Sequence, residues 1–300
     1  MVALFPKIPD RHKEGNPLVP TGLGVFYVLI SVIYLFLLHY YYGVNFHQEL
    51  SIQALTLAVC ILFGGFMGLL DDWMDLRWRY KAFLPIVAAL PLGVLRQGTP
   101  VMATYFFGKI DFCRLSFWVV PGEIIFYFAV IPLIVTITTN AVNQLGGLNG
   151  LETICPSTVL IALMIVSNSE TRILLFVPLV TYLVLAFFNF QGKIFVGNTG
   201  SFAIGITIAA YALIANREQA LLISILPYIF NSALKLLNIF LFGQTAALKM
   251  RGNILYSNHR KSLLTLIAFY KPTTERKLVL IVSAIFMIFA CLAVFVNLLT

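Results

Sequence analysis

The feature that most constrains this chain is its succession of long apolar runs, separated by short polar segments. A helix crosses a bilayer with roughly 17–25 apolar residues, and helices suit lipid because their backbone groups bond to one another. Hydrophobic residues make up 60% of the chain and charged residues 11%, whereas a soluble domain averages about 25% charged. We therefore expect an all-α, polytopic integral membrane protein that forms one domain over residues 1–300. Nine spans are predicted, at 23–42, 51–70, 82–96, 123–140, 154–168, 172–190, 201–215, 220–241 and 277–298.

Lysine and arginine are unevenly divided between the two sides of this arrangement. With the N-terminus inside, the inner segments hold 13 of them and the outer segments hold 5, while Lys235 and Lys277 lie in or at spans. Cytoplasmic loops carry an excess of Lys and Arg, so we expect the N-terminus in the cytosol and the C-terminus outside. Residues 1–20 are polar and contain several prolines, which is unlike a cleaved signal peptide.

Four polar segments fall on the predicted cytosolic side. Because they share one face, they predict one composite site at the membrane surface. The last of these segments belongs to a longer cytosolic loop, 242–276, all of which is assigned to the site. The alternative is a set of ordinary solvated loops, but asparagines and glycines at membrane depth favour a site. The segments read DDWMDLRWRYK (71–81), NAVNQLGGLNGLE (140–152), GKIFVGNTGS (192–201) and GNILYSNHRKS (252–262).

Three acids stand at the end of the second apolar run. Asp71 and Asp75 are four residues apart, which predicts that they share a helix face, with Asp72 about 100° round the helix. Carboxylates at this place could hold Mg²⁺, which binds a few protein oxygens together with substrate phosphates, or one of them could act as a base. The alternative is a solvated helix end whose charge is neutralised by the basic residues that follow it.

Two glycine-rich stretches and one basic stretch complete the pattern. GGLNG (146–150) and VGNTG (196–200) predict short loops whose N–H groups can approach a phosphate or a flat base. NHRKS (258–262) suits anionic oxygens, although a basic loop also suits a simple membrane anchor. Together these parts favour transfer of a phosphosugar from a nucleotide to a lipid phosphate. An intramembrane prenyltransferase is disfavoured because the sequence has no second Asp-rich cluster, and a transporter or flippase because it has no internal repeat.

Two motifs, GLLDDWMDLRWRYKAFLP and TTNAVNQLGGLNGLE, give the chain a resemblance to a known family. They resemble the polyprenyl-phosphate N-acetylhexosamine-1-phosphate transferases (glycosyltransferase family 4), and the ending NGLE is similar to the eukaryotic and archaeal dolichol branch. The match runs from PTGLG (20–24) to NHRKS (258–262). The resemblance implies an enzyme that transfers GlcNAc-1-phosphate from UDP-GlcNAc to a dolichyl-type phosphate, releasing UMP, as the first step of lipid-linked glycan assembly.

The resemblance also implies roles for the matching residues and a cofactor, which is Mg²⁺ with Mn²⁺ as an alternative. The implied catalytic group is Asp71, Asp72, Asp75 and Lys81, where Lys81 matches a lysine on the phosphate side. The implied metal ligands are Asn143 and Asn198. The implied substrate-binding residues are Asn149 for the uracil, Phe195 and Gly197 for the uridine turn, His259 and Arg260 for the sugar and pyrophosphate, and Glu152 of the NGLE motif.

Three features depart from the family pattern. The family usually has ten spans, with a helix before the P-x-x-G segment, and residues 1–19 cannot supply that helix. Thr21 stands where the dolichol branch often has an acid. Asn198 stands where the pattern FVGDTG has a metal-binding Asp, so a weakly active or non-catalytic homologue is an alternative.

The implied partners are UDP-N-acetylglucosamine, a polyprenyl or dolichyl phosphate and membrane lipid, with no nucleic acid and with a homodimer left open. The bacterial activities of the superfamily, which transfer phospho-MurNAc-pentapeptide or use undecaprenyl phosphate, are the alternative substrate readings. We expect a multi-pass protein of the cell membrane, or of the endoplasmic reticulum membrane in a eukaryotic cell, with its active site on the cytosolic face.

Overall fold

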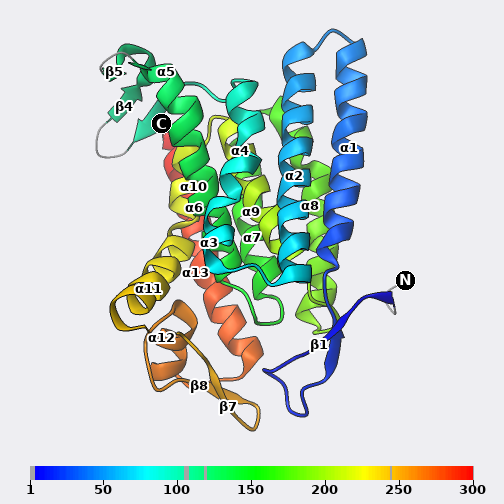
Figure 1. Cartoon of the computed structure of the whole chain (residues 1–300), viewed down its shortest axis with the longest axis vertical. Coiled ribbons are helices and arrows are strands. Elements are labelled where there is room, and N and C mark those ends of the chain that lie inside the picture. Colours follow the sequence, from blue (N-terminus) through cyan, green and yellow to red (C-terminus); the bar gives the residue numbers. More distant parts are fainter. Residues whose placement is uncertain (1–3, 105–107, 118–119, 244, 300) are drawn as a thin grey trace.

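The computed structural model describes residues 4–104, 108–117, 120–243 and 245–299. Most of these residues are helical, and the helices form an elongated bundle (Figure 1). The helices are α1 (Gly24–Val44), α2 (Gln48–Met74), α3 (Trp78–Phe83), α4 (Pro85–Val94), η2 (Phe112–Arg114), α5 (Gly122–Ile125), η3 (Phe126–Val130), α6 (Ile131–Gln144), α7 (Leu151–Val166), α8 (Ser169–Phe190), α9 (Gly197–Ile214), α10 (Glu218–Ser224), α11 (Leu226–Phe242), α12 (Leu263–Tyr270) and α13 (Glu275–Leu299).

Short antiparallel hairpins stand at the two ends of the bundle, which the all-α expectation did not include. Each hairpin pairs two neighbouring strands, so the sheets stay small and the membrane part remains helical. The strands are β1 (Lys7–Pro9) with β2 (Leu18–Pro20), β3 (Val101–Thr104) with β4 (Gly108–Asp111), β5 (Ser116–Phe117) with β6 (Val120–Pro121), and β7 (Lys249–Arg251) with β8 (Ile254–Tyr256).

All nine predicted apolar segments are helical, but not all are long, straight helices. Within the described residues, six helices are long and apolar enough to cross a membrane: α1, α2, the continuous helix Gly122–Gln144, α8, α9 and α13. The segment predicted at 220–241 is bent by 57° between α10 and α11, beside Pro227, and makes a seventh if counted as one span. Proline also explains the break at 82–96, where α4 starts at Pro85. The chain is thus a multi-pass membrane protein with six, or up to seven, candidate spans.

Glycines allow three helices, α1, α2 and α9, to approach one another closely near the predicted site. A Cβ on Gly68 of α2 would collide with the backbone of Asn198, and a Cβ on Gly24 of α1 would collide with the backbone of Gly200. Small residues allow membrane helices to approach this closely. Consequently, the start of α9 lies directly against α1 and α2, close to the acids that follow the apolar part of α2.

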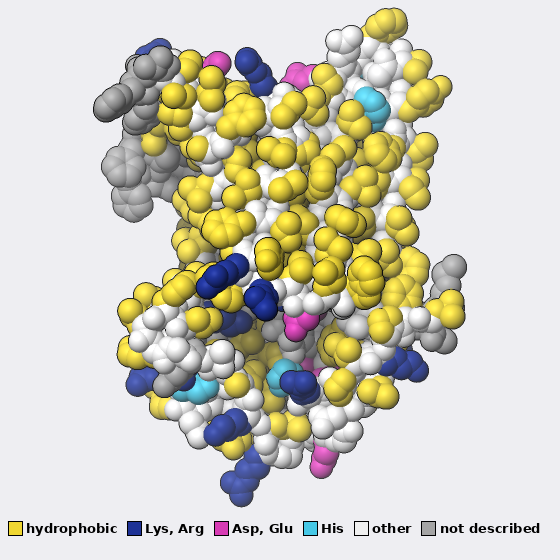
Figure 2. Space-filling view, in the orientation of Figure 1, with side chains coloured by type: hydrophobic (Ala, Val, Ile, Leu, Met, Phe, Trp, Pro, Cys, Tyr) yellow, Lys and Arg dark blue, Asp and Glu magenta, His cyan; other side chains and the backbone are white. Residues whose placement is uncertain are grey.

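One end of the bundle carries the hairpins β1–β2 and β7–β8 together with α12 (Figure 1). Hydrophobic side chains cover the bundle above it, while charged side chains and histidines gather at this end around a hollow (Figure 2). We call this the polar end. It holds the four predicted polar segments, 71–81, 140–152, 192–201 and 252–262.

Candidate active site

The carboxylate of Asp72 accepts hydrogen bonds from the first turn of α9. Its Oδ1 accepts a hydrogen bond from the backbone N–H of Asn198 (2.8 Å), and its Oδ2 accepts from the N–H and the hydroxyl of Thr199 (2.9 and 2.7 Å). The N–H groups at a helix start lack intrahelical partners and favour a negative charge. Gly197 has a φ of 72°, and a Cβ there would lie 2.8 Å from Asp72 Oδ2. The residue types at 72 and 197 therefore fix where α9 begins.

Asp71, in contrast, is buried and paired with a lysine. Its Oδ1 lies 2.8 Å from Lys81 Nζ and accepts a hydrogen bond from the N–H of Leu76 (3.0 Å). Its Oδ2 is buried and has no protein partner among the described residues. Asp71 is thus well placed to hold the Lys81 ammonium.

The expectation that Asp71 and Asp75 share a helix face is wrong. The helix α2 ends at Met74, and Asp75 follows it in a left-handed conformation with a φ of 46°. The Asp75 side chain is fully exposed, 3.6 Å from Lys81 Nζ. Helical spacing stops applying once the helix ends, so the two acids are linked through Lys81 instead of by a common face.

A polar pocket of about 710 Å³ opens at the polar end. Asn143, the penultimate residue of α6, accepts a hydrogen bond through its Oδ1 from the hydroxyl of Ser201 (2.7 Å), which ties α6 to α9. Many predicted site residues line the pocket, but so do residues of the N-terminal hairpin and of α11. The lining residues include Asp10, Arg11, His12, Asp72, Asn143, Gln144, Gly147, Glu152, Phe195, Gly197, Asn198, Ser201 and Lys235.

Glu152 is a pocket acid whose pKa is raised by its surroundings. It lies in the first turn of α7, before the apolar segment that begins at residue 154, and its Oε1 accepts a hydrogen bond from the N–H of Gly147 (2.8 Å). Burial raises the pKa of this carboxyl to about 6, the Gly147 N–H opposes the rise, and the charge of Asp72 adds to it. Glu152 therefore changes charge close to neutral pH.

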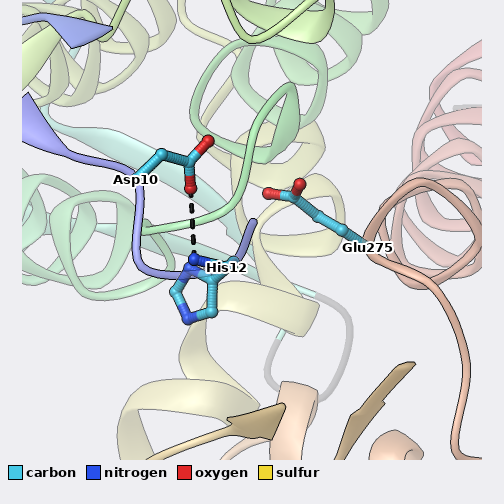
Figure 3. Close-up of side chains that lie close together, drawn as sticks. All are labelled: Asp10, His12 and Glu275. Carbon is cyan, nitrogen blue, oxygen red and sulfur yellow. Dashed lines mark hydrogen bonds between the residues drawn. The ribbon is translucent and has the colours of Figure 1, made fainter. Parts of the chain in front are cut away.

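Asn149 is held in a buried network behind the pocket. Its side-chain amide donates to Asp10 Oδ2 (2.7 Å) and to Glu275 Oε1 (2.9 Å), and its backbone N–H also donates to Glu275 Oε1 (2.8 Å). Lys13 lies 3.2 Å from Asp10. Figure 3 shows Asp10 and Glu275 directed toward the same space beside His12.

The network joins three segments that are distant in sequence: the N-terminal hairpin, the 145–150 loop and the start of α13. Its two carboxylates and the imidazole lie close enough to hold a metal ion. However, the amide of Asn149 and the ammonium of Lys13 already donate to the carboxylates. Asn149 does not line the polar pocket, so its implied contact with a uracil stays a prediction.

An apolar groove of about 870 Å³ runs beside the pocket, between α3, α6 and α11. The surface of its walls is mostly apolar, although polar residues such as Thr136, Asn140 and Ser232 also line it. Asn143, Gln144 and Lys235 line both the groove and the polar pocket. Lys81 lines the groove as well, so its pairing with Asp71 fixes an ammonium at the groove wall.

The predicted basic loop lies apart from these two cavities. The Arg260 guanidinium donates to the hydroxyl of Tyr270 (2.7 Å) and lies over the ring of Phe269 at 5.0 Å. His259 Nε2 accepts from the N–H of Ala247 (3.4 Å). Partial burial lowers the pKa of His259, and the charges of Lys261 and Lys249 lower it further. Neither His259 nor Arg260 lines the pocket or the groove, so their implied sugar contacts stay predictions.

Sequence reasoning missed Asp10, Arg11, His12, Ser201 and Lys235. The first three stand in a polar segment before the first span, where only the Lys and Arg residues enter the sequence argument, as charge on the cytosolic side. A mixed-charge stretch between two prolines, PDRHKEGNP (9–17), was the available signal for a folded turn. Lys235 is a single charge within an apolar run, which by itself indicates a functional position.

Comparison with known proteins places the chain in a family. Residues 52–216 match the model of glycosyl transferase family 4, and the chain belongs to that family. It is 30% identical, over 95% of its length and 86% of the relative's, to a putative UDP-N-acetylglucosamine–dolichyl-phosphate N-acetylglucosaminephosphotransferase of Saccharolobus solfataricus. It is 28% identical to the enzyme of that name in Dictyostelium discoideum, over 74% of this chain and 62% of the relative.

A bacterial relative is also similar to the chain. It is the phospho-N-acetylmuramoyl-pentapeptide-transferase of Fervidobacterium nodosum, 28% identical over 83% of this chain and 74% of the relative. The family that the motifs suggested is thus confirmed. The matched region contains Asp72 of α2 together with α6 and α9, which form part of the polar pocket; the N-terminal hairpin and Lys235 of α11 lie outside it.

Proposed function

We propose that this protein transfers GlcNAc-1-phosphate from UDP-GlcNAc to a dolichyl-type phosphate, releasing UMP and forming a lipid-linked GlcNAc diphosphate. The observation that carries the proposal is the common wall of the polar pocket and the apolar groove, formed by Asn143, Gln144 and Lys235. A nucleotide sugar is strongly polar and a polyprenyl chain is apolar, so the two need different cavities that meet at their phosphates. The names of the archaeal and eukaryotic relatives support the same substrates.

The chemistry is a displacement at phosphorus. An oxygen of the lipid phosphate attacks the sugar-bearing phosphorus of UDP-GlcNAc and forms the new P–O bond. The bond from that phosphorus to the bridging oxygen breaks, and UMP leaves with the electron pair. The second pKa of a phosphate monoester is about 6, so the acceptor is largely ionised at neutral pH and needs little help from a base. The main task of the protein is to position two anions and offset their repulsion.

The residues of the pocket fit the magnesium ion that the family implies. Asn143, Asn198 and Glu152 bring amide and carboxylate oxygens to one cavity, and such oxygen donors suit Mg²⁺ or Mn²⁺. These three residues would hold the ion. When bound, it would neutralise charge on the diphosphate. Both oxygens of Asp72 already accept hydrogen bonds from α9, so we assign Asp72 to orienting that helix start.

The remaining side chains have roles that follow from their contacts. Phe195 and Gly197, at the pocket wall, would lie against the nucleotide. Asp71 holds the Lys81 ammonium at the groove, where Lys81 would offset negative charge that develops during transfer. The apolar groove would take the first units of the prenyl chain.

The finer topology belongs to the same proposal. We infer nine membrane segments, with α3–α4, α7 and the bent pair α10–α11 completing the set, and with the polar end in the cytosol. The excess of Lys and Arg in the segments of that end supports the orientation. A homodimer stays a prediction, which light scattering of the purified protein would test.

The test is direct transfer. Purified protein would be incubated with radiolabelled UDP-GlcNAc, dolichyl phosphate and Mg²⁺, and the label would be measured in the organic phase. We expect label in the lipid, dependent on both dolichyl phosphate and metal. Parallel reactions with undecaprenyl phosphate and UDP-MurNAc-pentapeptide test the activity named for the bacterial relative. No lipid-soluble label from any donor would refute transferase activity and leave a non-catalytic homologue.

A further inference from the structure

One charged side chain is common to three cavities at the polar end. Lys235 lies in α11, beyond the bend that separates it from α10. It lines the polar pocket, the apolar groove and a side cavity of about 320 Å³ that also contacts Arg11 and His12. Lys235 therefore stands where the space for a nucleotide sugar and the space for an apolar chain meet.

The ammonium of Lys235 is held in place but not neutralised. It donates a hydrogen bond to the backbone carbonyl of Gln144, the last residue of α6. Among the described residues, no carboxylate oxygen lies within 4.0 Å of the Lys235 nitrogen, the distance limit for a salt bridge. An ammonium has three donors, so two are available to a ligand. A partly buried cation without a counter-ion is costly, which favours binding of an anion.

Lys81 provides the contrast at the same groove. It also lines the groove, but its ammonium lies 2.8 Å from Asp71 and 3.6 Å from Asp75. Two acids already balance that charge. An incoming phosphate is therefore attracted more strongly to Lys235, the groove lysine without an acidic partner.

We propose that Lys235 binds the phosphate of the polyprenyl acceptor and holds it at the junction of the groove and the polar pocket. The identity of this anion rests on the proposed function. The prenyl chain would follow the apolar walls from this point, and the phosphate, which carries about −1.5 to −2 charges at neutral pH, would meet the ammonium. The ammonium contacts Gln144, the residue that follows Asn143, and both Asn143 and Lys235 line the polar pocket, so the acceptor would face the diphosphate.

The first test separates the two substrates. Lys235→Met removes the charge and keeps an unbranched apolar stem, Lys235→Arg keeps the charge, and Lys271→Met is the control at an exposed lysine. We expect Lys235→Met to raise KM for dolichyl phosphate about 10- to 100-fold, because this is the change that the loss of one hydrogen bond to a charged group produces. KM for UDP-GlcNAc should not change, and Lys235→Arg should recover part of the loss. A raised KM for UDP-GlcNAc alone would overturn the assignment.

The second test needs no turnover. Dolichyl phosphate should stabilise the wild-type protein against heat more than dolichol does, and Lys235→Met should lose that difference. This result would support Lys235 even if no GlcNAc-1-phosphate were transferred, an outcome that refutes only the proposed function. Conversely, equal stabilisation of wild type and Lys235→Met by dolichyl phosphate would overturn the proposal even in an active enzyme. If Lys235→Met lowered only the melting temperature and left KM and the stabilisation by dolichyl phosphate unchanged, the role of Lys235 would be purely structural.

Discussion

Asp72→Asn tests whether one carboxylate both fixes the start of α9 and serves the site. Asp72 accepts three hydrogen bonds, from the N–H of Asn198 and from the N–H and hydroxyl of Thr199, at 2.7–2.9 Å. An amide has a single acceptor oxygen and no charge. The variant would therefore lose at least one of these bonds and the negative charge beside the helix N-terminus.

The expected magnitude follows from these contacts. A hydrogen bond to a charged group contributes about 1.5–3 kcal/mol, and a charge at a helix end about 0.3–1 kcal/mol. Asp72 is exposed, and solvent screening reduces both contributions, so we expect a loss of about 1–2 kcal/mol of stability. Turnover should fall about 10²-fold, the scale of a small misplacement of the reacting groups, because the same bonds position Gly197 and Asn198 at the pocket.

Two assays and one control separate these effects. Thermal unfolding in detergent measures stability, and transfer of radiolabel at saturating substrate measures turnover. The control is Thr199→Val, which removes only the hydroxyl bond and leaves the carboxylate; it should lose some stability and keep most turnover. Wild-type turnover in Asp72→Asn would refute the functional reasoning, and wild-type stability would refute the capping of α9.

Four further predictions follow from the site. Asn198→Asp should lower the Mg²⁺ concentration for half-maximal activity, because it adds a charge to the pocket; an unchanged titration would place Asn198 away from the metal. The pKa of Glu152, about 6, predicts that activity rises with pH through 6 as the carboxylate forms. Glu152→Gln should remove the part of that rise that Glu152 supplies and leave the part due to the acceptor phosphate, whose second pKa is also about 6; a pH profile identical to that of the wild type would contradict a metal-holding role. Arg260→Lys should lower kcat/KM, since an ammonium does not replace a planar guanidinium; a wild-type value would mark the loop as a membrane anchor. Single cysteines placed in the polar segments 71–81, 140–152, 192–201 and 252–262 should not react with a label added outside intact cells. Labelling of any one of these segments would contradict a single cytosolic site.

The membrane class, the positions of the apolar spans and the family could all be predicted from the sequence. Apolar runs are a local property, and lipid requires a helix wherever such a run crosses it. Motif spacing was equally informative, because Asp72, Asn143, Glu152 and Asn198 all line one pocket. These residues lie near helix ends, so the order of helices brings them to the same end of the bundle.

The other side chains that join them are set by tertiary contacts, which the sequence does not reveal. The N-terminal hairpin brings Asp10 within hydrogen-bonding distance of Asn149. Lys235 lines the groove from α11, after the bend between α10 and α11. Neither contact leaves a periodic pattern in the sequence, because each depends on a turn that joins distant segments. The close approach of α9 to α2, through Gly68 and Asn198, likewise decided that Asp72 orients a helix start. Sequence spacing describes neighbours on one element, whereas these functions come from side chains that meet across elements.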